Sequence, residues 1–312
     1  MAQDPEAGMT PDENNNDVRT GLIAGLAAYT MWGFLPIYFK VLGPVAATEV
    51  LAHRIIWAVP VGALILTFRN QWPEVRKAFS DWRALRGMGI TAAFIAVNWG
   101  VYIWTVQTDR IFQASLGYYI NPLMFVLVGV FVNREVLRRG QIAAVALAAI
   151  GVSVLTIYGG VFPWISFVLA ISFTFYGYLR KTVQIGAMPG LFIETIWLVL
   201  PAIAFWLWLE MQGTSAFTPD APGTIGLLLL AGPLTVIPLL FFAISARRLR
   251  LSTIGFMQFL GPTLQFCVGL YYGETFTTAH AICFGFIWVA VIVFSLDALA
   301  AGRRPKRVAE PA

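Results

Sequence analysis

The chain has 312 residues, of which 58% are hydrophobic and only 12% are charged. A soluble globular domain is typically about 45–50% apolar and about 25% charged, so this composition excludes an ordinary soluble domain and indicates a membrane protein. The formal net charge of +5 would suit a nucleic-acid-binding protein, but the basic residues lie in short segments between long apolar runs. Membrane orientation explains that distribution better, and we expect no nucleic-acid partner.

In chain order, residues 1–18 come first; they are polar and acidic, have no apolar face, and predict a disordered tail. Ten apolar segments follow, and a helix of roughly 20 residues crosses a hydrocarbon core of about 30 Å. Backbone groups in lipid must bond within their own segment, so helices are predicted. The sixth segment is the shortest. The ten lie near residues 21–39, 46–68, 88–107, 111–132, 140–158, 163–179, 188–210, 223–245, 251–272 and 279–300.

The loops between these segments alternate in charge. One side of the membrane collects 18 of the 21 basic residues, the other collects 2, and Arg54 lies within a span. Positive residues stay on the cytoplasmic side, so we expect a multi-pass protein with both termini in the cytoplasm and a basic cytoplasmic tail at 301–312. The longest loop, residues 69–87, is predicted to hold a short interfacial helix with Trp72 and Trp82 at the headgroup layer.

An offset of about 140 residues relates the two halves of the chain. It aligns Pro60 with Pro201, and Asn121-Pro122 with Gly261-Pro262. Five spans separate each residue from its counterpart, so the halves would face opposite ways across the membrane. The predicted fold class is an all-α membrane protein of ten transmembrane helices in two inverted five-helix repeats. Chance similarity between apolar segments is the alternative. The two repeats would span residues 19–158 and 159–300.

The repeat also predicts a site. Proline or glycine interruptions at matching places in the two halves mark the binding site of many secondary transporters, near the middle of the bilayer. The predicted helix kinks are at Pro60, Pro122, Pro201 and Pro262. Polar residues at helical spacing accompany them, and interhelical hydrogen bonding is the alternative role for these side chains. The predicted substrate-binding residues are Trp32, Asn98, Tyr102, Tyr118, Asn121, Gln258 and Gln265.

Ionisable residues inside spans are rare and usually functional; the second span has Glu49, His53 and Arg54, and the seventh has Glu194. Glu49 and His53 are four residues apart and share one helix face, Arg54 points elsewhere, and the repeat places Glu194 at the position of His53. We predict that these four act in coupling or gating. A histidine titrates near neutral pH, so protons are a candidate coupling ion. Structural ion pairs are the alternative.

Other chemistry has little support in the sequence. Cys267 and Cys283 both lie in apolar segments without metal-ligand spacing, so we expect small core side chains and neither a disulfide nor a metal site. The chain lacks the sequence motifs of serine hydrolases, zinc proteases and phosphate-binding loops. We therefore expect no enzyme and no cofactor.

Several stretches together resemble the RarD branch of the EamA transporter family, within the drug/metabolite transporter superfamily. The stretches are NWGVYIWTVQTDRIFQASLGYYINPL from Asn98, WGFLPIYFK (Trp32–Lys40), EVLAHRIIW (Glu49–Trp57), FYGYLRK (Phe175–Lys181) and LLLAGPLTVIPLLFFAISARRLRLSTIGFMQFLGPTLQF (Leu228–Phe266). The resemblance covers nearly the whole chain apart from its tails. It implies ten spans and a central cavity lined by the first four helices of each half.

The resemblance also implies the activity. We expect a secondary transporter that moves a small metabolite or drug across the bacterial inner membrane by alternating access, most often outward. The substrate and the oligomeric state stay open. Two other functions also stay open, a flippase for a lipid-linked substrate and an intramembrane enzyme built on Glu49 and His53.

Overall fold

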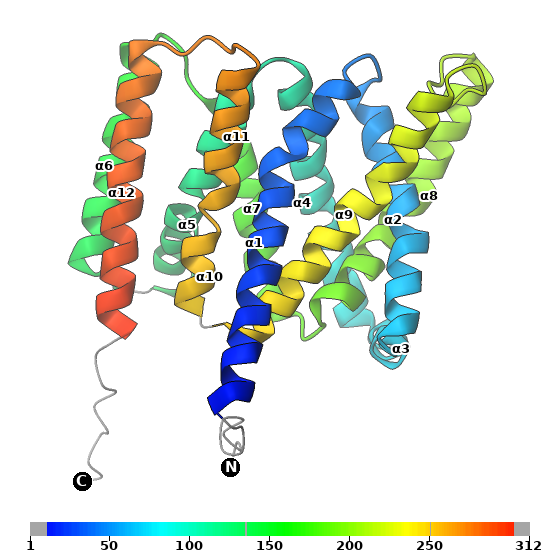
Figure 1. Ribbon diagram of the computed structural model, residues 1–312, viewed down its shortest axis with the longest axis horizontal. Coiled ribbons are helices and arrows are strands. Elements are labelled where there is room, and N and C mark those ends of the chain that lie inside the picture. The colour runs from blue at the N-terminus through cyan, green and yellow to red at the C-terminus, as the bar shows by residue number, and fades with distance from the viewer. Residues whose placement is uncertain (1–10, 135, 250, 303–312) are drawn as a thin grey trace. The chain divides into compact units, whose positions relative to one another are not determined.

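The computed structural model describes residues 11–134, 136–249 and 251–302 (Figure 1). Within these residues every regular element is an α-helix, which confirms the all-α fold class. The helices are α1 (Pro11–Val41), α2 (Ala47–Phe68), α3 (Trp72–Ser80), α4 (Trp82–Gln107), α5 (Ile111–Asn133), α6 (Arg139–Ile157), α7 (Trp164–Thr182), α8 (Ala187–Gln212), α9 (Pro222–Arg248), α10 (Leu251–Met257), α11 (Leu260–Tyr271) and α12 (Thr278–Gly302).

Nine helical stretches of the described residues are long and apolar enough to cross a membrane, judged by length and composition. They correspond to nine of the ten predicted spans, with α10 and α11 together forming one of them. The sixth predicted span forms α7 at the expected place but is not among the nine. Its 19 residues include Ser166, Ser172 and Thr174, with Arg180 and Lys181 in the last turn. The multi-pass membrane fold is therefore supported, and the count of ten spans stays a prediction.

The N-terminal helix is longer than its apolar segment. α1 begins at Pro11, so residues 11–18 are helical where the sequence predicts a disordered tail. Two polar contacts lie in this part of α1: Thr20 donates to the carbonyl of Asn16 (2.8 Å), and Arg248 pairs with Asp17 (2.7 Å). Residues 1–10 and most of the predicted basic tail, 303–312, lie outside the described residues.

The longest loop holds the short helix that the sequence predicts. α3 covers nine residues, and the indole of Trp72 at its start donates to the hydroxyl of Thr67 (2.9 Å). The carboxylate of Glu74 accepts a hydrogen bond from the backbone of Gly186, just before α8. Trp82 is exposed, as a side chain at the headgroup layer would be.

The described residues form two compact units. Unit 1 comprises 11–35, 44–89, 185–249 and 251–261, and unit 2 comprises 36–43, 90–134, 136–184 and 262–302. In unit 1, α2 packs against both α8 and α9; in unit 2, α12 packs along α6 and α5 along α7. At four of the five points where the chain passes from one unit to the other, a proline or glycine is present: Pro36, Gly43-Pro44, Gly89 and Gly261-Pro262.

The two matched proline positions differ in the structure. Pro262 has no N–H, and its ring clashes with the carbonyl four residues earlier, which belongs to Gln258. The ninth span is interrupted at that residue: α10 ends at Met257 and α11 begins at Leu260 (Figure 1). By contrast α5 is continuous through Pro122. α2 and α8 are likewise continuous through Pro60 and Pro201, so only one of the four predicted positions interrupts its helix.

Candidate functional site

The buried polar groups of unit 1 gather on α2, α8 and α9. Arg54 on α2 is 5% exposed, and its Nε donates to the hydroxyl of Thr235 on α9 (2.8 Å). That hydroxyl in turn donates to the carbonyl of Ala231 (2.8 Å). Glu194 on α8 is completely buried and Thr195 beside it nearly so. A charge inside a membrane protein is costly unless it is hydrogen-bonded. Helices that only packed against one another would not need such groups, so the polar interior between these three helices is a candidate site.

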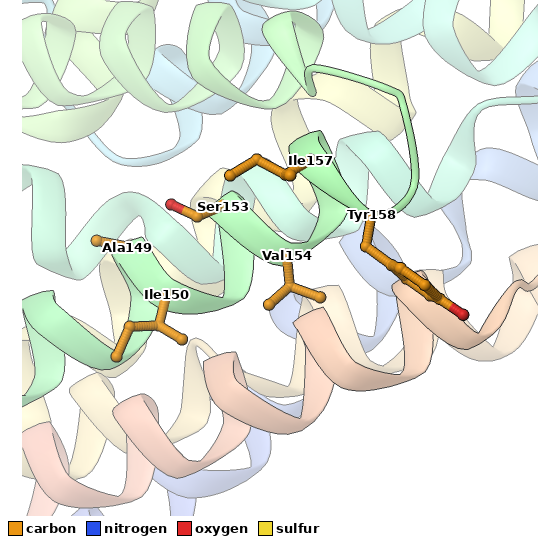
Figure 2. Close-up of a pocket in the computed structure, with 6 residues that line it drawn as sticks. All are labelled: Ala149, Ile150, Ser153, Val154, Ile157 and Tyr158. Atoms are coloured by element: carbon orange, nitrogen blue, oxygen red, sulfur yellow. The ribbon is translucent and has the colours of Figure 1, made fainter.

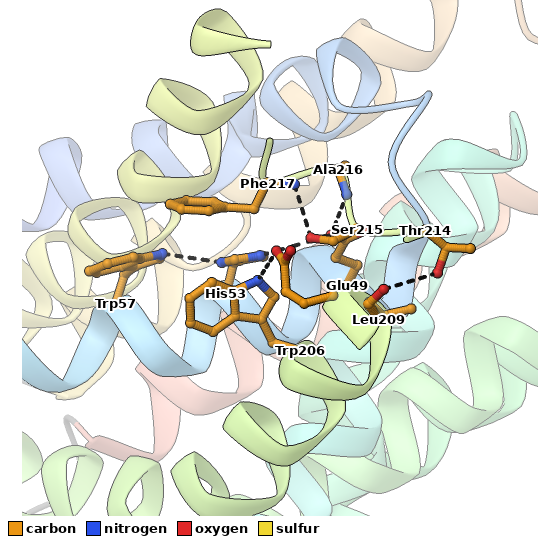
Figure 3. Close-up of polar contacts among 10 residues, drawn as sticks. Glu49, His53, Trp57, Trp206, Leu209, Thr214, Ser215, Ala216 and Phe217 are labelled. Carbon is orange, nitrogen blue, oxygen red and sulfur yellow. Dashed lines mark hydrogen bonds and ion pairs between the residues drawn. The ribbon is translucent and has the colours of Figure 1, made fainter. Parts of the chain in front are cut away.

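His53, one turn before Trp57 on α2, is completely buried (Figure 3). Its Nδ1 accepts a hydrogen bond from the indole N–H of Trp57 (3.2 Å). The imidazole stacks on Phe217, with ring centroids 5.0 Å apart and planes at 17°, and it meets the edge of Trp206 at 5.5 Å. Aromatic walls therefore exclude water from most of the imidazole.

Glu49 lies on the same face, as predicted from its spacing. One carboxylate oxygen accepts from the backbone N–H of Ala216 (2.7 Å) and from the hydroxyl of Ser215 (3.1 Å), so it fastens the segment between α8 and α9 to the start of α2. The same oxygen lies 4.0 Å from His53 Nε2 (Figure 3). A catalytic acid–base pair needs about 2.6–3.2 Å, so this spacing gives no support to the enzyme alternative.

Unit 2 contains an uncharged network centred on Asn98, which is 1% exposed on α4. Its amide nitrogen donates to the carbonyl of Leu169 and to the hydroxyl of Ser172, both at 3.0 Å and both on α7. Its amide oxygen accepts from the hydroxyl of Tyr118 on α5 (3.2 Å). Both donors of the amide and its acceptor are used, so Asn98 holds three helices together and orients Tyr118.

Aromatic rings extend from this network in a row of edge-on and tilted contacts. Tyr102 and Tyr118 lie 5.6 Å apart, Tyr118 and Phe173 6.1 Å, and Phe173 and Tyr176 6.0 Å. Phe39 meets Tyr102 at 5.9 Å. We call these five residues the aromatic row. Tyr118, Phe173 and Tyr176 are half-buried, so their faces are partly available to a ligand. Sequence reasoning missed Phe173 and Tyr176, because an aromatic residue in an apolar segment is indistinguishable from a lipid-facing one.

Pro262 and Thr263, which follow the break, are bound to α5 within unit 2. Ser115 on α5 donates to the carbonyl of Pro262 (2.8 Å), and the hydroxyls of Tyr119 and Thr263 share a hydrogen bond (2.7 Å). Asn121 is 7% exposed, and within the described part of the chain its amide oxygen has no hydrogen-bond partner. That oxygen is an available acceptor two helical residues from Tyr119.

The predicted substrate residues fall into both units. Trp32, in unit 1, packs against Tyr29 (5.5 Å) and Phe242 (5.9 Å), and Gln258 is the first residue of the break between α10 and α11. Five others lie in unit 2: Asn98, Tyr102, Tyr118, Asn121 and the buried Gln265. Contacts join Asn98, Tyr102 and Tyr118, whereas the convergence of all seven stays a prediction.

A second cluster lies at the N-terminal end of α5. It was not identified as functional from the sequence. Glu274 accepts from the backbone N–H groups of Ile111 (2.6 Å) and Phe112 (3.0 Å), the first residues of α5. Burial raises the pKa of Glu274, although these two bonds and nearby Lys40 act in the opposite direction. Lys40 also pairs with Asp109 and lies 5.6 Å from the ring centre of Tyr272.

A shallow surface groove runs along α6 (Figure 2). It is mostly apolar and lies on a single helix, so it lacks the converging polar groups of a ligand site. Its only polar side chains are those of Ser153 and Tyr158, so the groove gives little support to the flippase alternative. Its lining residues are Ala149, Ile150, Ser153, Val154, Ile157 and Tyr158.

Comparison with known proteins identifies the family. The model of the EamA-like transporter family matches residues 19–157. An uncharacterized transporter of Vibrio cholerae is 43% identical over 300 residues, covering 96% of this chain and 99% of its own. Protein RarD of Streptomyces exfoliatus is 42% identical, covering 95% of each chain, and protein RarD of Escherichia coli K12 is 39% identical, covering 93% and 98%.

Fold comparison agrees with the sequence matches. A solved structure described only as a crystal structure of a protein has a TM-score of 0.59 to this chain and 18% identity, covering 91% of this chain and 99% of its own. At that identity the likeness concerns the fold alone. The relatives at about 40% identity extend over nearly the full chain. The chain therefore belongs to the EamA-like transporter family, in its RarD branch.

Proposed function

We propose that this membrane protein is a secondary transporter that moves a small molecule across the bacterial inner membrane by alternating access, usually outward. Its family and its relatives, which include proteins described as transporters, support membrane transport. The finer proposal adds two inverted five-helix repeats, ten spans counting α7, and both termini in the cytoplasm. The partners are the small molecule and the surrounding lipid.

One contact pattern carries the inverted-repeat part of the proposal. On α2, Trp57 packs against Gly232 of α9: a Cβ added to that glycine would lie 2.3 Å from the Trp57 carbonyl oxygen. On α8, Trp197 packs against Gly89 of α4, where an added Cβ would lie 3.2 Å from the indole. The two tryptophans are 140 residues apart and the two glycines 143, so the repeat offset relates the first pair to the second. The two contacts differ in detail, since Gly232 meets the backbone of Trp57 and Gly89 meets the indole of Trp197, but each places a glycine against the matching tryptophan of the other helix.

The family match supports the same division. It covers residues 19–157, almost the range predicted for the first repeat, 19–158. Helix pairing is also consistent with the repeat, because α2 packs on α8 and α6 on α12, and each of these pairs joins a helix to its predicted counterpart. Inverted repeats permit alternating access, because the two halves can exchange their conformations.

The aromatic row is our preferred surface for the cargo. Tyr118, Phe173 and Tyr176 would contact the apolar part of the molecule, and the amide oxygen of Asn121 would accept from a donor on it. Asn98 is assigned to positioning Tyr118, since both of its amide donors and its amide oxygen already make hydrogen bonds inside unit 2. A mainly apolar surface with few oriented polar groups is typical of small-molecule sites.

A transport screen tests this proposal. Inside-out membrane vesicles from cells that produce the protein should accumulate at least one metabolite or drug that control vesicles do not. Phe173→Ala and Asn121→Ala should each lower that rate by about tenfold, which corresponds to about 1.4 kcal/mol. Ile157→Ala, an exposed position on α6, is the matched control and should transport normally. Wild-type rates in both site variants would overturn the site, and vesicles that move no compound would overturn the function.

Orientation needs a separate test. Cys267 is exposed and Cys283 is buried, and both are free, so a Cys267→Ser and Cys283→Ser background removes native thiols. Asp109→Cys should react with a membrane-impermeant maleimide in intact cells, whereas Asn70→Cys should react only after the membrane is opened. The reverse pattern would invert the proposed orientation.

A further inference from the structure

The two ring nitrogens of His53 have different surroundings. Nδ1 accepts the indole hydrogen of Trp57, and an acceptor nitrogen cannot carry its own proton. In the neutral imidazole the proton must therefore lie on Nε2. Within the described residues Nε2 has no hydrogen-bond partner, and a Glu49 carboxylate oxygen lies 4.0 Å from it (Figure 3).

The charges around the ring are mainly negative. Glu49 faces it from α2, and Glu210 on α8 lies within electrostatic reach and accepts from the indole of Trp206 at 3.0 Å. Glu210 is exposed, whereas Glu194, also on α8, is completely buried. The segment between α8 and α9 presents Phe217 to the ring, and the cation of Arg54 donates to Thr235 on α9. An added positive charge on the imidazole would thus have carboxylates nearby.

We infer that His53 is the proton-binding site of the transporter, with Glu49 as its counter-ion; this inference rests on the proposed transport function. A proton from water binds Nδ1 and produces an imidazolium with N–H groups at both nitrogens. The indole of Trp57 loses its acceptor, and Nε2–H is drawn toward Glu49. The pair changes from a net charge of −1 to 0, and no other reactant is consumed.

Protonation of His53 would affect α9, because Trp57 and Glu49 both contact α9 or the segment just before it. The backbone of Trp57 is packed directly on Gly232 of α9, and its indole stacks on Phe217 with centroids 6.2 Å apart. Glu49 holds the backbone of Ala216, just ahead of α9. The bond that protonation breaks and the ion pair that it forms therefore both lie where α2 meets α9, so proton binding would alter this packing.

The chain is well suited to a direct test, since it has only two histidines. His280→Gln leaves His53 as the single histidine, and ¹⁵N-histidine NMR of this variant in lipid nanodiscs reports its tautomer and protonation. We expect the Nε2–H tautomer at about pH 9 and protonation of Nδ1 in a single step as the pH is lowered to about 3. The Nδ1–H tautomer at high pH, or no protonation in this range, would overturn the inference.

Two substitutions in the His280→Gln background should move the midpoint in opposite directions. Trp57→Phe removes a bond that exists only with the neutral ring, so the midpoint should rise, by about one pH unit. Glu49→Gln removes the counter-ion, so the midpoint should fall by about one pH unit. Trp197→Phe, at the corresponding position of the second repeat, is the control and should leave the midpoint unchanged. Unchanged midpoints in both test variants would overturn the role of this pair.

The transport assay and the histidine titration can fail independently, so each tests a different proposal. If His53 titrates as expected but vesicles move no compound, the proposed transport function is overturned while the proton site stands. If vesicles transport a compound with equal rates with and without a pH gradient, and His53 does not titrate, only the proton site is overturned.

Discussion

Two close helix pairs, α2 with α9 in unit 1 and α5 with α7 in unit 2, use glycine in the same way but differ in chemistry. An added Cβ at Gly232 would lie 2.3 Å from a carbonyl oxygen of α2, and one at Gly117 would lie 2.9 Å from the carbonyl of Ser166 on α7. Beside the first contact lies the charged Arg54, bonded to Thr235. Close to α5 and α7 lies the uncharged network of Asn98.

This difference separates a responsive region from a fixed one. The Asn98 amide has used both donors and its acceptor, so no gain or loss of charge alters its bonding. A buried ionisable cluster behaves otherwise, because its free energy depends steeply on every proton and counter-charge. We therefore assign coupling to the α2–α9 region, and orientation of the cargo-facing rings to the α5–α7 region.

The largest expected effect tests the shared packing. Gly232→Ala forces a methyl group onto the backbone of Trp57 and should lower stability by about 3 kcal/mol, whereas Gly117→Ala should cost about 1–2 kcal/mol. Thermal and denaturant unfolding of purified protein in detergent would measure both. Gly226→Ala on α9, where an added Cβ meets nothing within 4 Å, is the control and should be neutral or slightly stabilising. A larger effect at Gly117 would reverse the comparison.

Next in size is the loss of the buried cation. Arg54→Gln removes a charge-assisted hydrogen bond to Thr235 and should cost about 2 kcal/mol, against about 1 kcal/mol for Thr235→Val. If Arg54 is needed for coupling, Arg54→Gln should also remove the dependence of vesicle transport on a pH gradient, which Thr235→Val should retain. Equal gradient dependence in wild type and Arg54→Gln would place Arg54 among the purely structural residues.

A smaller effect is expected in the uncharged network. Asn98→Leu should lower stability by about 1–2 kcal/mol, because interhelical hydrogen bonds in membranes contribute about 0.6 kcal/mol each. Tyr118→Phe should cost about 0.6 kcal/mol. Since the two residues share one bond, the double variant should be less destabilised than the sum of the two. Strict additivity would show that the Asn98–Tyr118 bond contributes nothing.

The smallest effect concerns Glu274, whose pKa is raised by burial. The folded protein then holds this proton more tightly than the unfolded chain does. Between the ordinary pKa of glutamic acid and the raised value, stability should fall as the pH rises, and the loss is complete above the raised value. Glu274→Gln cannot titrate and should flatten this part of the pH profile of the melting temperature. A variant that keeps the wild-type slope would contradict this prediction.

Local pattern predicted the helices well because apolar length alone decides whether a segment can span lipid. It predicted the pairing of Glu49 with His53 for a similar reason, since residues four apart share a helix face. It failed at residues 11–18, where α1 extends beyond its apolar stretch and makes contacts such as that of Asp17 with Arg248. Phe173 and Tyr176 were missed because a ring's partners lie on other helices.

The sequence by itself determined the all-α membrane fold, the family and the set of ionisable residues inside spans, because these follow from composition, length and motif. Only the tertiary structure decided that Pro262 breaks its helix while Pro122 leaves α5 continuous. It also decided that both amide donors of Asn98 are bonded while the imidazole of His53 keeps one nitrogen facing a carboxylate. A proline's effect and a polar group's free bonding capacity both depend on which neighbours supply partners, and neighbours distant in the chain are brought together only by the fold.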